Sequence, residues 1–541
     1  MDAFHLVPAR PRPEAPPPPP PPPPPRAVAA LRGVVAVALG VAVGHLVAAL
    51  TDPARSPLAA VGAMVVDLTP RWLEQLAVQT LGTNDKPALL GGLAVVVVVL
   101  SAAAGLLARR SRTLGTAMVL LLALGAAAAS LTRPGASPAD ALPSVIGALA
   151  ASAAFLRLTR PSRAASVTDD GPPAFAGDAA PRPKGAPSRR SVLVGILAVG
   201  AGAAVAGAIG ESLRRAGASA AAALRNVVLP APVDPAVALP GDVEVGVPGV
   251  TPFRVANADF YRVDTALVVP QIDPATWSLT VGGMVAAPFS LSYDELLAMP
   301  MVERDLTLTC VSNEVGGPYA GNARWLGVRL VDLLARADID PAAEQLLSRS
   351  VDGWTASTPA KVALDGRDAI LAVGMNGEPL PSEHGFPARL VVPGLYGFVS
   401  ATKWVTSIEA TTYGAQTAYW TQRGWATDAP VRTMARIDVP QPLSTVDAGR
   451  VAIAGVTWAQ HRGVEGVEVQ VDDGPWREAR LGGAPSDDTW RQWVLAWDAV
   501  PGRHVLRVRA TDRTGTTQDP ERRTPFPSGA TGWHEVVVTV V

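Results

Sequence analysis

The chain has 541 residues, of which 48 % are hydrophobic and 17 % charged, and its formal net charge at pH 7 is −1. This length allows two or three domains with full cores, and the balanced charge excludes a basic face for nucleic acid. A single cysteine excludes an intrachain disulfide framework and any cysteine-clustered zinc or iron–sulfur site. The apolar residues are concentrated before about residue 210, and the remainder has the composition of a soluble protein.

The first 26 residues contain an unbroken run of prolines at positions 16–25. Such a run adopts polyproline II and cannot join a helix or a sheet. We therefore predict a disordered cytoplasmic tail over residues 1–26.

Residues 27–212 read as a membrane region, because they contain five apolar runs long enough to cross about 30 Å of hydrocarbon. A sixth run, residues 58–81, contains charged residues and a proline. The arginine clusters all fall on the cytoplasmic side only if this sixth run does not span the membrane. The sequence therefore favours five spanning helices. The sixth run would then lie on the outer face or enter the membrane as a re-entrant segment. The only histidine of the region is His45, so a bis-histidine haem is not expected there. The five runs are residues 27–50, 88–108, 113–131, 141–158 and 192–210.

Residues 188–193, Ser-Arg-Arg-Ser-Val-Leu, precede the last apolar run. They resemble an internal twin-arginine export signal, although a plain positive flank of a last helix would look similar. Cleavage after residue 206 and retention as an anchor both remain open. The interpretation is a multi-pass protein of the cell membrane, in contact with lipid, whose soluble half lies on the extracytoplasmic side.

After a linker at residues 213–248, the sequence pattern predicts an α+β domain over residues 249–428. Residues 277–281 alternate like a strand. A helix starts at Ser292, with Glu295 at the capping-box position. Residues 306–309 form a strand that places Cys310 at its end, before a turn-prone stretch. A lone cysteine is more often inert than reactive, but a strand end that opens onto a glycine-rich loop is typical of functional side chains.

The last region, residues 429–541, alternates apolar and polar residues in short runs separated by turn residues. This spacing predicts an all-β sandwich. The clearest runs are residues 449–458, 464–472, 490–497, 504–511 and 534–541.

Several separated motifs after residue 250 resemble, in the right order, those of the sulfite oxidase family of molybdopterin enzymes. In chain order these are the entry motif, the cysteine segment, the tryptophan–glycine motif, the long pterin signature and the dimerisation domain. The resemblance implies a sulfite-oxidase-like catalytic domain followed by an immunoglobulin-like domain that forms a homodimer. The matching stretches are residues 257–262, 308–313, 323–328, 384–404 and 455–472.

The resemblance also implies a molybdenum–molybdopterin cofactor, in which molybdenum is held by two dithiolene sulfurs and the thiolate of Cys310. The dianionic phosphate of the pterin requires cationic donors, for which Arg389 and Lys403 are suited. The implied cofactor-binding residues are Asn257, Phe260, Tyr261, Arg262, Cys310, His384, Arg389 and Lys403, and the implied catalytic residues are Cys310, Arg262, Asn313 and Trp425.

Two positions depart from the family's sulfite oxidases. Trp425 stands where they carry a tyrosine near the substrate, and Glu314 stands where they carry an arginine. Loss of a cation and gain of a carboxylate oppose binding of the sulfite dianion. We therefore expect two-electron oxygen-atom transfer on a small neutral S- or N-oxo substrate, with a separate electron-transfer partner or a quinone and with no haem. The alternative is a non-catalytic membrane receptor or scaffold that kept the fold.

Overall fold

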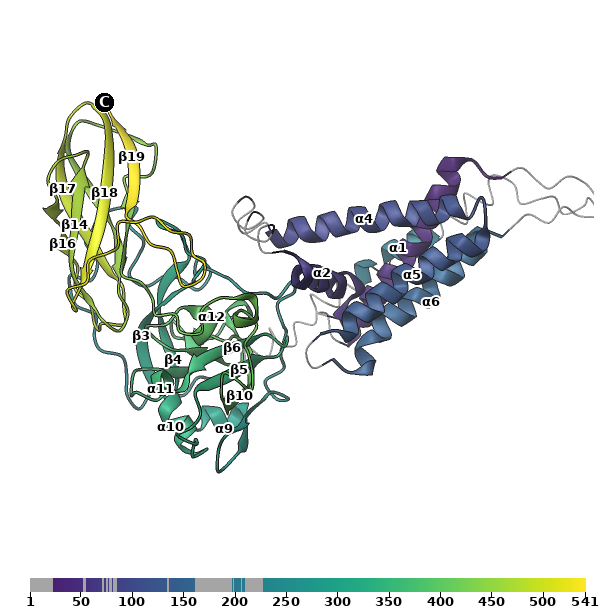
Figure 1. Cartoon of the computed structure of the whole chain (residues 1–541), viewed down its shortest axis with the longest axis horizontal. Helices are drawn as coiled ribbons and strands as arrows, with labels where there is room; N and C mark the ends of the chain where they lie inside the picture. Colours follow the sequence, from purple (N-terminus) through teal and green to yellow (C-terminus); the bar gives the residue numbers. More distant parts are fainter. Residues whose placement is uncertain are drawn as a thin grey trace, which may run out of the picture. The chain divides into compact units, whose positions relative to one another are not determined.

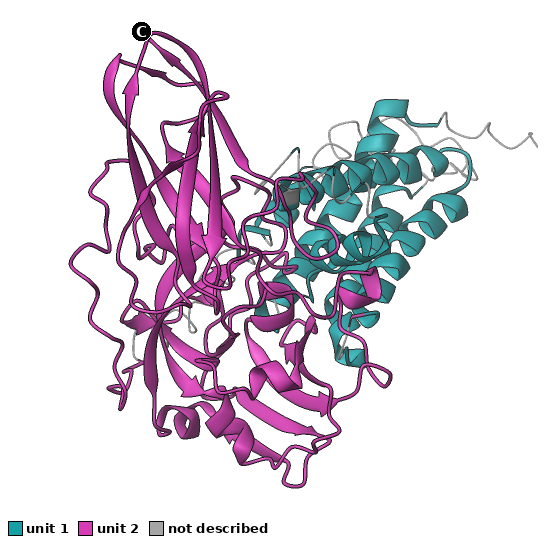
Figure 2. Ribbon diagram, turned by 60° about the vertical axis from the view of Figure 1, so that its left-hand side comes forward, with its two compact units in different colours: residues 1–132, 136–213 teal, residues 133–135, 214–541 magenta. Residues whose placement is uncertain are grey.

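The computed structural model, shown in Figure 1, describes most of the chain. It divides into two compact units, coloured separately in Figure 2: Met1–Thr132 with Ala136–Leu213, and Arg133–Gly135 with Arg214–Val541. The described residues are 23–51, 55–70, 73, 76, 80, 85–133, 136–160, 197, 199–205, 207–209 and 227–541.

Four helices of the first unit are long and apolar enough to cross a membrane. They coincide with four of the five apolar runs that the sequence predicts to span the membrane. Only part of the fifth, residues 192–210, is described, and the residues of the twin-arginine-like motif lie outside the described part of the chain. The first three of the four helices are α1 (Arg26–Leu50), α4 (Asp85–Leu107) and α5 (Arg112–Leu131). The fourth, Pro138–Leu158, consists of the 3-10 helix η3 (Pro138–Ala141) and α6 (Leu142–Leu158).

Glycines on α1 let its backbone approach two neighbouring helices closely. A Cβ added to Gly33 would lie 2.0 Å from the carbonyl oxygen of Ser101 on α4, and one added to Gly40 would lie 2.6 Å from that of Gly147 on α6. Small residues at such crossings are typical of packing between membrane helices, where van der Waals contact must replace the hydrophobic effect.

The predicted segment 58–81 begins with a shorter helix, α2 (Pro57–Leu68). Ser56 caps it by accepting a hydrogen bond from the amide of Ala59 at 3.3 Å, and the extended backbone of Thr69 ends it. Its 12 residues, at 1.5 Å each, cannot cross about 30 Å of hydrocarbon.

The second unit begins with a β-rich domain built on two sheets. The first has the strand order β2-β1-β10-β5-β6, in which only β1 and β10 run parallel. The second has the order β3-β4-β7-β8, with β9 also paired to β7. The strands are β1 (Ser278–Gly283), β2 (Phe289–Ser292), β3 (Val302–Thr309), β4 (Ala320–Arg329), β5 (Gln345–Ser350), β6 (Thr355–Pro359), β7 (Ile370–Met375), β8 (Glu378–Pro379), β9 (Arg389–Val391) and β10 (Val405–Thr411).

The helices of this domain are short, so the α+β domain that the sequence predicts is rich in β-structure. The predicted cap is confirmed: the hydroxyl of Ser292 accepts from the amide of Glu295 at 3.3 Å, and the carboxylate of Glu295 accepts from the amide of Ser292 at 2.7 Å. The helices are α9 (Tyr293–Leu297), α10 (Leu330–Ala335), α11 (Ala360–Ala363) and α12 (Gly397–Ser400).

The C-terminal region consists of two sheets, with the orders β11-β13-β17-β16 and β12-β19-β18-β14-β15, that share one apolar core. Five of its strands confirm the predicted alternating runs to within two residues. The strands are β11 (Met434–Val439), β12 (Thr445–Val446), β13 (Gly449–Trp458), β14 (Val464–Val471), β15 (Arg477–Glu478), β16 (Arg480–Leu481), β17 (Arg491–Ala499), β18 (Gly502–Asp512) and β19 (His534–Val540).

The second half of the predicted linker packs against both parts of this unit. Asp234 forms a parallel bridge with Val302 at the start of β3. Further on, the amide of Val245 donates to the side-chain oxygen of Gln492 on β17 at 2.7 Å. This segment therefore ties the β-rich domain to the sandwich.

Candidate active site

Cys310 follows β3 directly and is buried, with 8 % of its surface exposed. Its amide donates to the carbonyl of Tyr319 at 2.9 Å, and its carbonyl accepts from the amide of Asn313 at 3.1 Å. The side-chain oxygen of Asn313 in turn accepts from the amide of Tyr319 at 2.8 Å. Cys310 thus lies at the start of a loop, residues 310–319, whose two ends are joined by a hydrogen bond. The side chain of the buried Asn313 stabilises this arrangement by accepting from Tyr319.

The surroundings of Cys310 favour a protonated thiol in the chain alone. Burial raises the pKa of Cys310, while hydrogen bonds from Ser312 and the nearby charge of Lys403 oppose that rise. Metal coordination replaces the thiol proton, so such a buried cysteine is suited to binding a metal and not to reacting with solvent.

Phe260 and Tyr261, from the predicted entry motif, pack beside this loop. The Phe260 ring is stacked on Tyr261 at 5.2 Å and meets Trp325 and His384 edge-on at 5.8 and 5.6 Å. Gly321 on β4 leaves room for it, because an added Cβ would lie 2.8 Å from the Phe260 ring. Burial raises the pKa of Tyr261, and the charge of Cys310 raises it further. The Tyr261 ring lies 6.3 Å from that of Tyr319, whose carbonyl accepts from the amide of Cys310.

Asn257 and His384 contact each other across the domain. The carbonyl of Asn257 accepts from Nε2 of His384 at 2.8 Å, and its side-chain oxygen accepts from the amide group of Asn376 at 2.8 Å. Burial lowers the pKa of His384 to about 4, so the ring is neutral and carries its proton on Nε2. The Nε2 donor of His384 is therefore already used by the carbonyl of Asn257.

Arg389, on β9, is a buried cation with 5 % of its surface exposed. It donates to the carbonyls of His384 at 3.1 Å and Ala401 at 3.4 Å and lies 5.1 Å from the centre of the Trp325 ring. Burial lowers its pKa to about 10. Within the described residues no carboxylate forms an ion pair with it. An uncompensated buried charge is costly, so this site is suited to an anionic group.

Lys403 and Arg262 share one carboxylate, Asp264, which the sequence analysis missed. The Lys403 ammonium lies 2.5 Å from an Asp264 oxygen and donates to the carbonyl of Glu383 at 3.0 Å. The Arg262 guanidinium contacts both oxygens of Asp264, at 2.8 and 3.3 Å. Burial lowers the pKa of Lys403 to about 8, against the effect of Asp264. Part of the positive charge predicted for the site is thus neutralised within the chain.

These residues fit a molybdopterin. Two further cations, Arg262 and Arg389, contribute to lowering the pKa of Lys403, and Asp264 is the carboxylate paired with Arg262 and Lys403 among the described residues. The remaining positive charge matches a dianionic phosphate. Within the described residues, no three His, Cys, Asp or Glu side chains gather to hold a metal.

Trp425 lies in an aromatic cluster. Its ring centre is 5.7 Å from that of Phe398 on α12, 6.1 Å from that of Trp420 and 5.3 Å from that of Phe526 in the sandwich. The neighbouring Tyr396 is buried; burial raises its pKa to about 12, and Cys310 contributes to that rise. The sequence analysis found neither Tyr396 nor Phe526. Glu314 is exposed.

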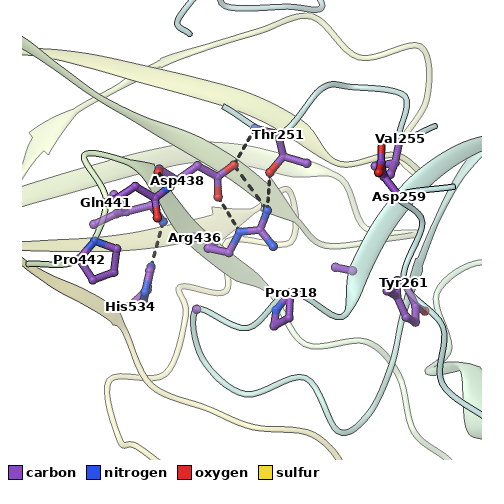
Figure 3. A pocket seen from close by; sticks show the side chains of 13 residues that line it. Thr251, Val255, Asp259, Tyr261, Pro318, Arg436, Asp438, Gln441, Pro442 and His534 are labelled. Atoms are coloured by element: carbon purple, nitrogen blue, oxygen red, sulfur yellow. Dashed lines mark hydrogen bonds and ion pairs between the residues drawn. The ribbon is translucent and has the colours of Figure 1, made fainter. Parts of the chain in front are cut away.

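A cavity of about 350 Å³ lies where the entry segment, the loop after Cys310 and the sandwich meet (Figure 3). Tyr261 and Gly316 line it from the β-rich domain, and Arg436 and His534 line it from the sandwich. Tyr261 therefore borders this cavity and also contacts the ring of Tyr319 in the loop after Cys310.

Comparisons with known proteins agree with this geometry. Residues 266–420 match the family model described as "Oxidoreductase molybdopterin binding domain". The chain is 30 % identical over 328 residues to the mitochondrial sulfite oxidase of Rattus norvegicus, covering 51 % of this chain and 60 % of that protein. The chain therefore spans about six-tenths of the length of that sulfite oxidase. It is 33 % identical over 176 residues to the uncharacterized oxidoreductase YuiH of Bacillus subtilis, covering 32 % of this chain and 85 % of that one.

Among solved structures, the sulfane dehydrogenase SoxCD from Paracoccus pantotrophus matches with a TM-score of 0.47 and 23 % identity. The match covers 55 % of this chain and 83 % of that chain.

Proposed function

Because the chain belongs to the sulfite oxidase family of molybdopterin-dependent oxidoreductases, we propose that it is a membrane-anchored enzyme that transfers an oxygen atom to or from a small neutral S- or N-oxo substrate. The family assignment favours an enzyme over a non-catalytic scaffold. When bound, the molybdenum cofactor supplies the two-electron chemistry of oxygen-atom transfer.

The observation that carries this proposal is a buried thiol, Cys310, on which the charge of Lys403 acts, together with three cations, Arg262, Arg389 and Lys403, that have only Asp264 as a paired carboxylate among the described residues. In the proposal, Cys310 is the protein ligand of molybdenum. The pterin is held by Asn257, Phe260, Tyr261, Arg262, His384, Arg389 and Lys403, and the substrate side is formed by Arg262, Asn313 and Trp425.

The charges around the site support a neutral substrate. Arg262 is paired with Asp264, and Glu314 adds an exposed carboxylate to the loop after Cys310. Trp425 contacts aromatic rings and offers an indole N–H where a phenol would offer a transferable proton. The pairing of Arg262 and the carboxylate of Glu314 reduce the attraction of the site for a dianion such as sulfite.

The test uses the purified full chain in detergent. We expect a reduced viologen to drive turnover of methionine sulfoxide or of another small S- or N-oxide, and we expect Cys310→Ser to abolish it. Oxidation of sulfite in the presence of an electron acceptor, with no turnover of neutral oxides, would refute the substrate class.

We also propose that the β-rich domain (residues 249–428) and an immunoglobulin-like dimerisation domain (residues 429–541) lie on the outer face of the cell membrane. The four apolar helices support anchoring, and electrons would pass to or from a separate partner or a quinone.

Val500, in an exposed turn, offers a labelling site, because the native Cys310 is buried. A membrane-impermeant maleimide should label Val500→Cys in intact cells, whereas labelling only after lysis would place the domain inside.

A further inference from the structure

The loop that follows Cys310, residues 311–319, is held from outside by the C-terminal sandwich. Arg436 on β11 donates from its guanidinium to the carbonyl of Gly317 at 3.0 Å. Arg436 is buried although it borders the cavity of Figure 3. A buried guanidinium that reaches a backbone carbonyl of another domain fixes that carbonyl in direction as well as in distance.

The remaining contacts of Arg436 fix its own orientation (Figure 3). Its Nε donates to Asp438 at 2.6 Å, and Nη2 donates to the hydroxyl of Thr251 at 2.8 Å. The amide of Thr251 closes the network by donating to the other oxygen of Asp438 at 2.9 Å. Because the guanidinium is planar and held on three sides, the donor aimed at Gly317 cannot swing away without breaking an ion pair.

His534, at the start of β19, makes a second contact with the same loop. Its Nδ1 accepts from the amide of Ile437 at 3.0 Å, and its ring lies against Gly316. A Cβ on Gly316 would lie 2.2 Å from Nε2, and the φ of this residue is +82°. Only glycine fits there, so the loop and the sandwich are in contact at two adjacent residues.

Hydrogen bonds inside the loop connect these contacts to the thiol. The amide of Gly317 donates to the carbonyl of Glu314 at 2.9 Å, and the amide of Asn313 donates to the carbonyl of Cys310 at 3.1 Å. Gly317 also packs so tightly against Asn313 that an added Cβ would lie 2.6 Å from its side-chain oxygen. The path from the sandwich to Cys310 is therefore short and closely packed.

We propose that Arg436 is a positioning residue: acting from the sandwich through Gly317, it fixes the loop after Cys310 and so sets where the Cys310 sulfur lies relative to the cofactor. This inference rests on the proposed role of Cys310 as the metal ligand. It makes the C-terminal sandwich a part of the active site and not only a neighbouring domain.

The test compares Arg436→Ala and Arg436→Lys with a matched control, Arg491→Ala, in the full chain with its cofactor. Arg491 also donates to two backbone carbonyls, those of Gly482 and Val464, but only within the sandwich. Two quantities are measured: hydrogen exchange of the amides in residues 311–319, and the Mo(V) electron paramagnetic resonance spectrum during a reductive titration.

For Arg436→Ala we expect about tenfold faster exchange in residues 311–319, as for the loss of one hydrogen bond to a charged group, together with shifted Mo(V) g-values. Arg436→Lys retains a donor and should restore part of both properties. Arg491→Ala should match the wild type in both.

Wild-type exchange and a wild-type spectrum in Arg436→Ala would overturn the proposal, as would equal changes in Arg436→Ala and Arg491→Ala. Faster exchange with an unchanged spectrum would also overturn it, because Arg436 would then only stabilise the loop. A wild-type chain without molybdenum would instead overturn the proposed function itself.

Discussion

The surroundings of Arg389 indicate that the ligand of the site is anionic. It is buried, its hydrogen bonds go to backbone carbonyls, and no carboxylate within the described residues compensates its charge. Such a cation is costly in a folded chain unless an anion arrives to pair with it.

Replacement of this cation should therefore reduce binding of the cofactor. We expect Arg389→Met to retain about tenfold less pterin than the wild type, because a charge-assisted hydrogen bond to phosphate is lost. The measurement is the fluorescence of pterin released by oxidation from equal amounts of purified chain. Arg329→Met, which alters a half-exposed arginine near Asp332, is the control. Equal pterin in all three chains would contradict the role of Arg389.

Sequence reasoning found the residues that carry recognisable motifs, Cys310 and Arg389 among them. It missed Asp264, because the pairing with Lys403 that brings this carboxylate into the site joins positions 139 residues apart, although Arg262 lies only two residues from it. It missed Phe526 for the same reason, since this ring reaches Trp425 from another domain. Contacts of this kind depend on the fold and leave no local pattern.

The strands were the most predictable elements. Alternation of apolar and polar residues marked β13, β14, β17, β18 and β19, because one face of each packs into the core of the sandwich. Their partners were not predictable. The parallel pairing of β1 with β10 joins Thr280 to Ser407, and no local signal specifies such a register.

The close packing of Gly321 on β4 against the Phe260 ring leads to a prediction about stability. Gly321→Ala places a methyl group 2.8 Å from the Phe260 ring, so we expect about 1–3 kcal/mol of destabilisation and a lower cofactor content. Gly282→Ala on β1, where an added Cβ meets nothing within 4 Å, should stay within about 0.5 kcal/mol of the wild type. Urea unfolding followed by tryptophan fluorescence measures both. Equal stability of the two variants would show that Phe260 is not tightly fixed.

At the scale of the whole molecule, the composition separates two halves that the structure also separates. The apolar excess before about residue 210 corresponds to the four long helices of the first unit, and the β-rich remainder forms the second unit. The number of spanning helices depends on residues 192–210, of which residues 192–196, 198, 206 and 210 lie outside the described part of the chain, so the predicted fifth helix stays a prediction.

The stability of the second unit should depend on pH through two histidines, His384, which is buried, and His534, which is partly buried. Burial lowers the pKa of both His384 and His534 to about 4, whereas an unfolded histidine titrates near 6.5. Between these values the unfolded chain binds more protons, so the free energy of unfolding of the cofactor-free chain should fall as the pH falls from about 6.5 to 4, by up to about 3 kcal/mol for each histidine.

Urea unfolding at a series of pH values measures this slope, because every tryptophan except Trp72 lies at or after position 277. His384→Gln with His534→Asn should flatten it. Asp472 raises the pKa of His504, so this group changes the free energy of unfolding with pH only above about pH 6.5. His504→Gln should therefore leave the slope below about pH 6.5 unchanged. A steep acid slope that persists in the double variant would contradict this explanation.

The central claim is that Cys310 binds molybdenum, and X-ray absorption at the molybdenum edge of the purified full chain tests it most directly. We expect three sulfur neighbours of molybdenum in the wild type, two from the cofactor and one from Cys310, and only the two cofactor sulfurs in Cys310→Ser. A chain that contains no molybdenum, or a sulfur shell that is the same in both chains, would contradict the claim.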